Sequence, residues 1–267
     1  IGSDDGNMYA LVDDGTSTVG QRPGWPFNTG TSFSFGRPAI GPDPEGIIYF
    51  SARNATLYAR FPDGTEKFTF NLGDNNIYMP GIDRSGGPQE GTVYSDRSGD
   101  ILVAIRPNGT TKWTFFMGAD VDSTPVVGPD GTIYFGTDMT DGGDFPLFAV
   151  DPDGNEIWRF LTGNQVDNIP ALNADGSEVY VVSMDGNLYA VNTEDGSEIS
   201  RFPIPVTPTA DSSALPNSSP AVGPDGTVYV GSTDNNLYAV GRIVEPSNIK
   251  NKYITSTKDG TNNRVAG

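Results

Sequence analysis

The stretch Thr124-Pro125-Val126-Val127-Gly128-Pro129-Asp130-Gly131-Thr132-Ile133-Tyr134 returns as Ser219-Pro220-Ala221-Val222-Gly223-Pro224-Asp225-Gly226-Thr227-Val228-Tyr229. Three further copies are anchored at Pro38, Pro80 and Pro170, and the copy at Pro80 has diverged to Met79-Pro80-Gly81-Ile82. The five anchor prolines are 42, 45, 45 and 50 residues apart. A fixed period of this length is the signature of a repeat architecture such as a β-propeller.

A second anchor, a hydrophobic residue followed by an aromatic residue and alanine, repeats in phase with the first. It occurs at Met8-Tyr9-Ala10, Leu57-Tyr58-Ala59, Leu147-Phe148-Ala149, Leu188-Tyr189-Ala190 and Leu237-Tyr238-Ala239, with a weaker copy at Leu102-Val103-Ala104. The best repeat predicts four strands, at residues 125–127, 132–136, 147–150 and 156–160, separated by Asp-Gly and similar turns. Asp-Gly and Asn-Gly between β-rich runs are strong hairpin signals. A β-sandwich would not explain two anchors repeating in phase.

The sequence therefore predicts an all-β chain with a single propeller of six four-stranded blades over residues 1–241. Six blades of this length fit a chain of 267 residues. The chain starts at Ile1 rather than Met and shows no signal sequence, so we expect a mature, processed chain or a fragment. Residues 242–267 form a predicted C-terminal tail, in which 251–256 has the pattern of a strand. That strand is expected either to close the ring or to exchange into a neighbouring molecule.

The repeats resemble the pyrroloquinoline-quinone (PQQ) repeat family. The resemblance rests on Ser218–Val222, Gly226–Ser232 and Asn236–Val240, and on the run from Ala149 to Trp158, and it covers residues 1–241. It implies a propeller fold and a role for Trp113 and Trp158 in docking neighbouring blades, with Phe70 and Phe202 in the equivalent place. Family members include quinone-dependent dehydrogenases and non-catalytic propellers of the outer-membrane-assembly type.

The chain departs from the catalytic members of that family because it has no cysteine and no histidine. The eight-bladed dehydrogenases place a cysteine pair over the cofactor, and the six-bladed sugar dehydrogenases use a histidine base. Serine and cysteine nucleophiles activated by histidine are excluded as well. We therefore expect no enzyme activity and no PQQ cofactor. The alternative is an enzyme that uses quinone chemistry or a carboxylate pair for hydrolysis.

The formal net charge of −18 excludes nucleic acid as an expected partner, because phosphates would be repelled. No apolar run is long enough for a membrane helix, so membrane insertion is not expected. Many of the aspartates stand in Asp-Gly turns, where Asp is the residue that tight turns favour. The charge leaves cations, cationic partners and neutral glycans as candidate ligands.

Two groups of acidic and amide side chains are candidate sites. The loops that enter the first strand of each blade would form a binding rim from Asp74, Asp120, Asp122, Asp167 and Asn217. An insertion between Gly136 and Leu147 carries Asp138, Asp141 and Asp144, whose oxygen ligands would suit Ca²⁺. The alternative for both groups is a set of solvated loops.

We expect a non-catalytic binding or scaffold propeller, which bound calcium could stabilise. Its expected location is the periplasm, the cell surface or the outside of the cell. A protein partner or self-association is expected. The alternative within this class is a subunit of a surface assembly or filament joined through residues 242–267.

Overall fold

The computed structural model describes residues 1–12, 20–31, 37–42, 44–73, 79–97, 100–119, 121, 123–138, 140, 142–206, 218–242, 253–255 and 264–266. These residues form strands and turns, and no α-helix occurs among them. Accordingly, they contain no helix that is long and apolar enough to cross a membrane. The chain divides into two compact units, Ile1–Ile133 with Asp151–Asn155, and Tyr134–Val150 with Glu156–Gly267.

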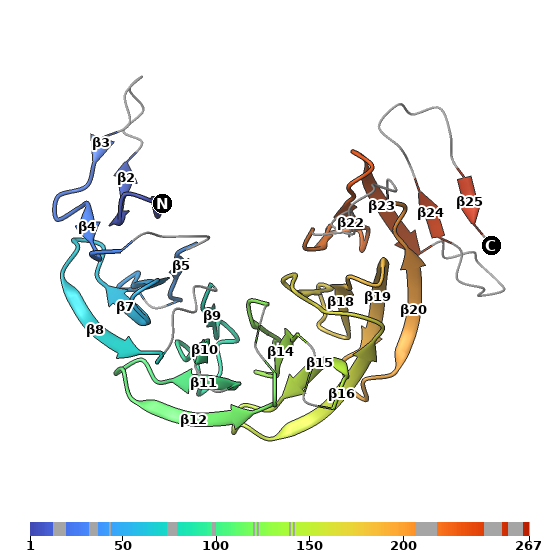
Figure 1. The fold of residues 1–267 in the computed structure, drawn as a ribbon, viewed down its shortest axis with the longest axis horizontal. Helices are drawn as coiled ribbons and strands as arrows, with labels where there is room; N and C mark the ends of the chain where they lie inside the picture. Colours follow the sequence, from blue (N-terminus) through green and yellow to red (C-terminus); the bar gives the residue numbers. More distant parts are fainter. Residues whose placement is uncertain are drawn as a thin grey trace. The chain divides into compact units, whose positions relative to one another are not determined.

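The first unit begins with paired short strands and continues with two four-stranded sheets (Figure 1). The short pairs are β1 (Asn7–Met8) with β4 (Phe27–Asn28), and β2 (Leu11–Val12) with β3 (Gly20–Gln21). The first sheet has the order β5 (Ala39–Ile40), β6 (Ile48–Ala52), β7 (Thr56–Arg60), β8 (Glu66–Asn71). The second has the order β9 (Gly81–Ile82), β10 (Val93–Arg97), β11 (Ile101–Ile105), β12 (Thr111–Phe116).

The third four-stranded sheet is the one within which the chain passes from the first unit to the second. Its order is β13 (Val126–Val127), β14 (Ile133–Gly136), β15 (Phe145–Val150), β16 (Glu156–Thr162). The next sheet has the order β17 (Ala171–Leu172), β18 (Glu178–Val182), β19 (Asn187–Asn192), β20 (Glu198–Pro203). The last has five strands, in the order β21 (Ala221–Val222), β22 (Val228–Gly231), β23 (Leu237–Arg242), β24 (Tyr253–Thr255), β25 (Arg264–Ala266).

The two sequence anchors are cross-strand partners in these sheets. The tyrosine of the first anchor pairs with the alanine of the second as Tyr49↔Ala59, Tyr94↔Ala104, Tyr180↔Ala190 and Tyr229↔Ala239. Because directly opposed side chains in an antiparallel pair contact each other, a small alanine leaves room for the tyrosine ring to lean across it. The in-phase repetition of the two anchors therefore follows from one repeated strand pair.

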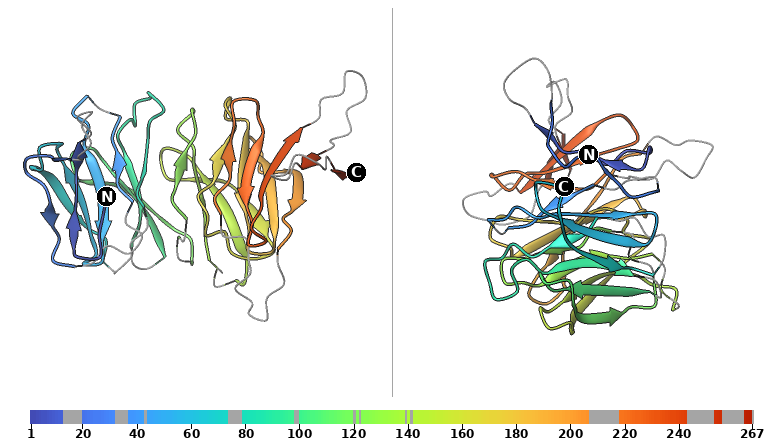
Figure 2. Two further views of the ribbon diagram at one scale, coloured as in Figure 1. Left: turned by 90° about the horizontal axis from the view of Figure 1, so that it is seen from above. Right: turned by 90° about the vertical axis from the view of Figure 1, so that its left-hand side faces the viewer.

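Apolar side chains fill the space between successive sheets, which are stacked face to face within each unit (Figure 2). In the first unit one cluster joins Tyr49 and Leu57 of one sheet to Val93 and Val103 of the next. In the second unit a corresponding cluster joins Tyr180 and Leu188 to Val228 and Val240. Burial of both faces explains why central strands such as β14 and β18 consist largely of apolar residues.

Candidate functional site

A repeated aromatic contact links each of several sheets to the next. On the fourth strand of three sheets, an aromatic ring pairs with the alanine of the second anchor. The pairs are Ala59↔Phe68, Ala104↔Trp113 and Ala149↔Trp158. Each ring also lies near the tyrosine of the first anchor, with centroid distances of 6.2 Å for Tyr49–Phe68, 5.7 Å for Tyr94–Trp113 and 5.8 Å for Tyr134–Trp158.

The rings reach a glycine in the turn before the fourth strand of the following repeat. Nε1 of Trp113 donates a hydrogen bond to the carbonyl oxygen of Pro152 at 2.9 Å, and a Cβ atom added to Gly154 would lie 2.7 Å from the Trp113 ring. Nε1 of Trp158 donates to the carbonyl oxygen of Thr193 at 2.9 Å, and an added Cβ on Gly196 would lie 2.7 Å from its ring. Glycine is required here because a side chain would displace the ring.

The placement of Phe70 and Phe202 as equivalents of these tryptophans is wrong. Phe70 pairs with Leu57, and Phe202 pairs with Leu188, so both lie two residues beyond the docking position. The residue at that position in the first sheet is Phe68, whose ring lies 2.7 Å from a Cβ atom added to Gly109.

Trp25 makes a related contact that sequence reasoning missed. Its Nε1 donates to the carbonyl oxygen of Pro62 at 3.0 Å, and its side chain is 7% exposed. Phe68, Trp113 and Trp158 each follow their paired alanine by nine positions, whereas Trp25 follows Ala10 by fifteen. Because the connection between Ala10 and Trp25 is longer, the nine-residue spacing could not identify Trp25 as a docking residue.

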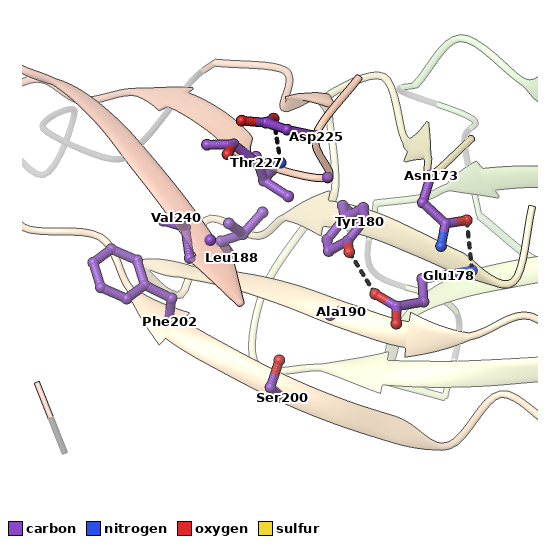
Figure 3. A pocket seen from close by; sticks show the side chains of 13 residues that line it. Asn173, Glu178, Tyr180, Leu188, Ala190, Ser200, Phe202, Asp225, Thr227 and Val240 are labelled. Carbon is purple, nitrogen blue, oxygen red and sulfur yellow. Dashed lines mark hydrogen bonds between the residues drawn. The ribbon is translucent and has the colours of Figure 1, made fainter. Parts of the chain in front are cut away.

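The sheet β17–β20 lacks the ring. Ser200 pairs with Ala190, at the position that Phe68, Trp113 and Trp158 hold in the other sheets. A pocket of about 280 Å³ lies beside it (Figure 3). Its lining residues are Asn173, Glu178, Tyr180, Leu188, Ala190, Ser200, Phe202, Asp225, Gly226, Thr227, Val228, Val240 and Gly241.

The pocket has an apolar side and a polar side. Leu188, Phe202 and Val240 lie together on one side in Figure 3, and all three belong to one buried cluster. On the other side the hydroxyl of Tyr180 donates a hydrogen bond to Oε2 of Glu178, whose side chain is 8% exposed. This combination of apolar walls and a few placed polar groups is typical of binding sites.

Local hydrogen bonds to the backbone position the two acidic residues of the pocket, Glu178 and Asp225. The backbone N–H of Glu178 donates to Oδ1 of Asn173 at 3.0 Å, which fixes the start of β18. The backbone N–H of Thr227 donates to Oδ1 of Asp225 at 3.0 Å, and this bond lowers the pKa of Asp225 from its usual value. The lining, composed of described residues, contains two carboxylates and no basic side chain.

Most of the expected binding rim lies outside the described residues. This holds for Asp74, Asp120, Asp122 and Asn217. Asp167 is described and half-buried, next to Asn168, whose side chain is 5% exposed. The convergence of the rim residues therefore stays a prediction.

The insertion between β14 and β15 places Asp138 and Asp144 in the described part of the chain, whereas Asp141 lies outside it. The backbone N–H of Asp144 donates to Oγ1 of Thr140 at 3.2 Å, and Asp144 is exposed. Within the described ranges no group of three acidic, histidine or cysteine side chains is placed to hold a metal ion. A calcium site formed by these three aspartates stays a prediction.

Several aspartates serve the turns of the repeat. Oδ1 of Asp63, Asp175 and Asp195 accepts hydrogen bonds from both the hydroxyl and the backbone N–H of the residue two positions later. The side-chain hydrogen bond is the largest cause that lowers the pKa of each of these carboxyls. These exposed carboxylates are structural parts of hairpins.

The repeated four-stranded sheets define the chain as an all-β propeller, which confirms the predicted fold class. The fold agrees with the crystal structure of BamB from Moraxella catarrhalis, with a TM-score of 0.58, 16% sequence identity, and coverage of 83% of this chain and 67% of that one. The family model described as outer membrane protein assembly factor BamB matches residues 82–260. The chain belongs to this family, which confirms the resemblance. A search of curated protein sequences gave no match.

Proposed function

We propose that this protein is a non-catalytic scaffold propeller that binds other proteins outside the cytoplasm. The observation that carries the proposal is the family match over residues 82–260, because the family is described as an outer membrane protein assembly factor. That description supports protein partners and an extracytoplasmic location. The net charge of −18 supports a partner other than nucleic acid.

The distribution of carboxylates supports a binding role over catalysis. Asp63, Asp175 and Asp195 are exposed and occupied by turn hydrogen bonds. Glu178 is buried, and its carboxylate accepts a hydrogen bond from Tyr180. With no histidine or cysteine in the chain, the two quinone-enzyme patterns that the repeats resemble lack their reactive side chains.

A quinone titration tests the non-catalytic proposal. The purified chain is mixed with PQQ and Ca²⁺, the absorbance of the quinone is followed, and dye reduction is assayed with alcohols and aldoses. We expect no saturable change in absorbance and no dye reduction above the buffer rate. Saturable binding together with substrate-dependent dye reduction would overturn the proposal.

We also propose that the tail completes the last sheet within its own chain. β24 pairs with β23 through Gly241↔Ile254 and Arg242↔Tyr253, and β25 pairs with β24. This pairing favours a fourth strand supplied in cis over a strand exchanged between molecules.

Light scattering separates this arrangement from the assembly alternative. We expect the full-length chain to remain a monomer of 28.3 kDa over a wide range of concentrations, with or without Ca²⁺. Concentration-dependent dimers or polymers that disappear when the chain ends at Val240 would instead support strand exchange through the tail.

A further inference from the structure

The pocket beside Ser200 is the repeat's aromatic position without its ring. We infer that this pocket binds an aromatic side chain, preferably tryptophan, presented by a partner protein. The inference rests on the proposed scaffold function and names the feature of the partner that the site would recognise. We call this pocket the ring slot; its key residues are Glu178, Tyr180, Leu188, Ser200 and Val240.

The register of the sheets shows what the ring slot lacks. Three sheets carry a tyrosine, an alanine and an aromatic ring side by side on three adjacent strands, as in Tyr94, Ala104 and Trp113. The sheet β17–β20 carries Tyr180, Ala190 and Ser200 in the same places. The tyrosine and alanine that accommodate a ring are therefore present, and the ring is replaced by a hydroxymethyl group.

The size of the ring slot fits the missing group. Its volume is about 280 Å³, whereas an apolar cavity of roughly 150 Å³ is enough to bind benzene. A Cβ atom added to Gly226, on the facing repeat, would meet nothing within 4 Å. Leu188, Phe202 and Val240 supply the apolar surface that an indole ring would cover.

The polar side of the ring slot selects for a donor. Indole Nε1–H only donates hydrogen bonds, and a carboxylate only accepts them. Trp113 and Trp158 donate to backbone carbonyl oxygens of the following sheet. In the ring slot the acceptor would be the Glu178 carboxylate, which faces the pocket beside Tyr180 (Figure 3). Because Glu178 and Asp225 are both acidic, a neutral or basic segment around the tryptophan should bind better than an acidic one.

A polypeptide side chain is the occupant that the repeat itself indicates. In the three sheets that carry the ring, an extended strand bears it. A tryptophan in an extended segment of a partner would place its ring beside the corresponding tyrosine and alanine, Tyr180 and Ala190, from outside the chain. Aromatic anchors in preformed pockets commonly dominate protein interfaces.

An NMR titration of the full-length chain tests the inference. The probe is the end-blocked peptide Gly-Gly-Trp-Gly-Gly, and peptides with phenylalanine, alanine, or glutamate on both sides of the tryptophan serve for comparison. We expect saturable shifts at Ser200, Gly226 and Val240 with the tryptophan peptide, weaker binding of the phenylalanine and glutamate-flanked peptides, and none with alanine.

Two variants and one control locate the binding. Ser200→Trp should weaken binding at least tenfold, because the new ring occupies the slot. Thr114→Trp, which adds a ring at an exposed position of β12, should bind as the wild type does. Glu178→Gln keeps the shape of the slot. It should weaken binding of the tryptophan peptide more than binding of the phenylalanine peptide, because a phenyl ring has no hydrogen-bond donor.

Absence of saturable shifts in the wild type, or binding that Ser200→Trp leaves unchanged, would overturn the inference. Such a result would leave the scaffold proposal standing, since that proposal is decided by the quinone titration. Conversely, quinone-dependent dye reduction would overturn the scaffold proposal without altering the peptide result.

Discussion

Replacing Trp158 by alanine should lower the free energy of unfolding by about 3–5 kcal/mol, the usual cost of removing a large aromatic side chain from a core. The Trp158 side chain is 8% exposed and belongs to the cluster that also contains Val179 and Val191. The variant also loses the hydrogen bond to the carbonyl oxygen of Thr193 and uncovers Gly196. Denaturant unfolding followed by circular dichroism measures the loss.

Two matched variants separate the contributions to this effect. Trp158→Phe keeps most of the apolar contact and loses the N–H donor. It should lower the free energy of unfolding by about 1 kcal/mol for the lost hydrogen bond, in addition to the cost of the smaller ring. Ile157→Ala alters the adjacent residue of β16, which is 47% exposed, and should change stability by no more than about 0.5 kcal/mol. If Trp158→Ala and Ile157→Ala unfold at the same denaturant concentration, the docking role of Trp158 is contradicted.

The second large effect is expected at Gly81, which follows the anchor proline at the position where the other repeats have alanine or valine. A Cβ atom on Gly81 would lie 2.3 Å from the carbonyl oxygen of Pro125 and 3.0 Å from its Cβ atom. The contacting atoms include backbone, so the clash cannot be relieved by rotating a side chain. Gly81→Ala should therefore destabilise the protein by about 1–3 kcal/mol, as other overpacked positions do. Thermal unfolding of the purified variant measures this.

Gly20→Ala is the matched control, because Gly20 is exposed and an added Cβ would meet nothing within 4 Å. Such a change should leave stability unaltered or raise it by about 0.4–1 kcal/mol through the unfolded state. Equal melting temperatures for the two variants would show that Pro125 does not approach Gly81 as described.

The repeat could be predicted from the sequence because the two anchors are the two strands of one repeated antiparallel pair. Tyr94 and Ala104 recur because they oppose each other across β10 and β11, so their spacing is set by the hairpin between them. Strand boundaries followed from the Asp-Gly turns. The last repeat was predicted with three clear strands, and the structure adds β24 and β25 to them.

The docking position was predicted less well, for a geometric reason. Phe68 and Phe70 stand two residues apart on one strand and therefore face the same side of the sheet. Only the register can tell which of them pairs with Ala59, and this register shifts between Ala59 and Arg60. Sequence alone contains no sign of that irregularity. The nine-residue spacing from alanine to ring would have identified Phe68 if it had been applied to every repeat.

The ring slot could not be predicted because it is defined by a missing side chain. Ser200 follows Ala190 by ten positions instead of nine, so the spacing rule points to the neighbouring Ile199. The pairing Ala190↔Ser200 is what assigns serine to the ring position. The acidic loops were visible in the sequence as candidate sites, but composition cannot distinguish a turn carboxylate such as Asp195 from a ligand-binding one.

The most direct test of the account is the thermal unfolding of Ser200→Trp beside Thr114→Trp and the wild type. If position 200 is the empty ring position of the repeat, the new indole fills the pocket beside Leu188 and Val240. The free energy of unfolding should then rise by about 0.5–2 kcal/mol, as cavity-filling substitutions commonly achieve. Ser200→Trp should then unfold at a higher temperature than the wild type. Thr114→Trp should unfold at the same temperature as the wild type. A lower unfolding temperature for Ser200→Trp than for Thr114→Trp would contradict the account.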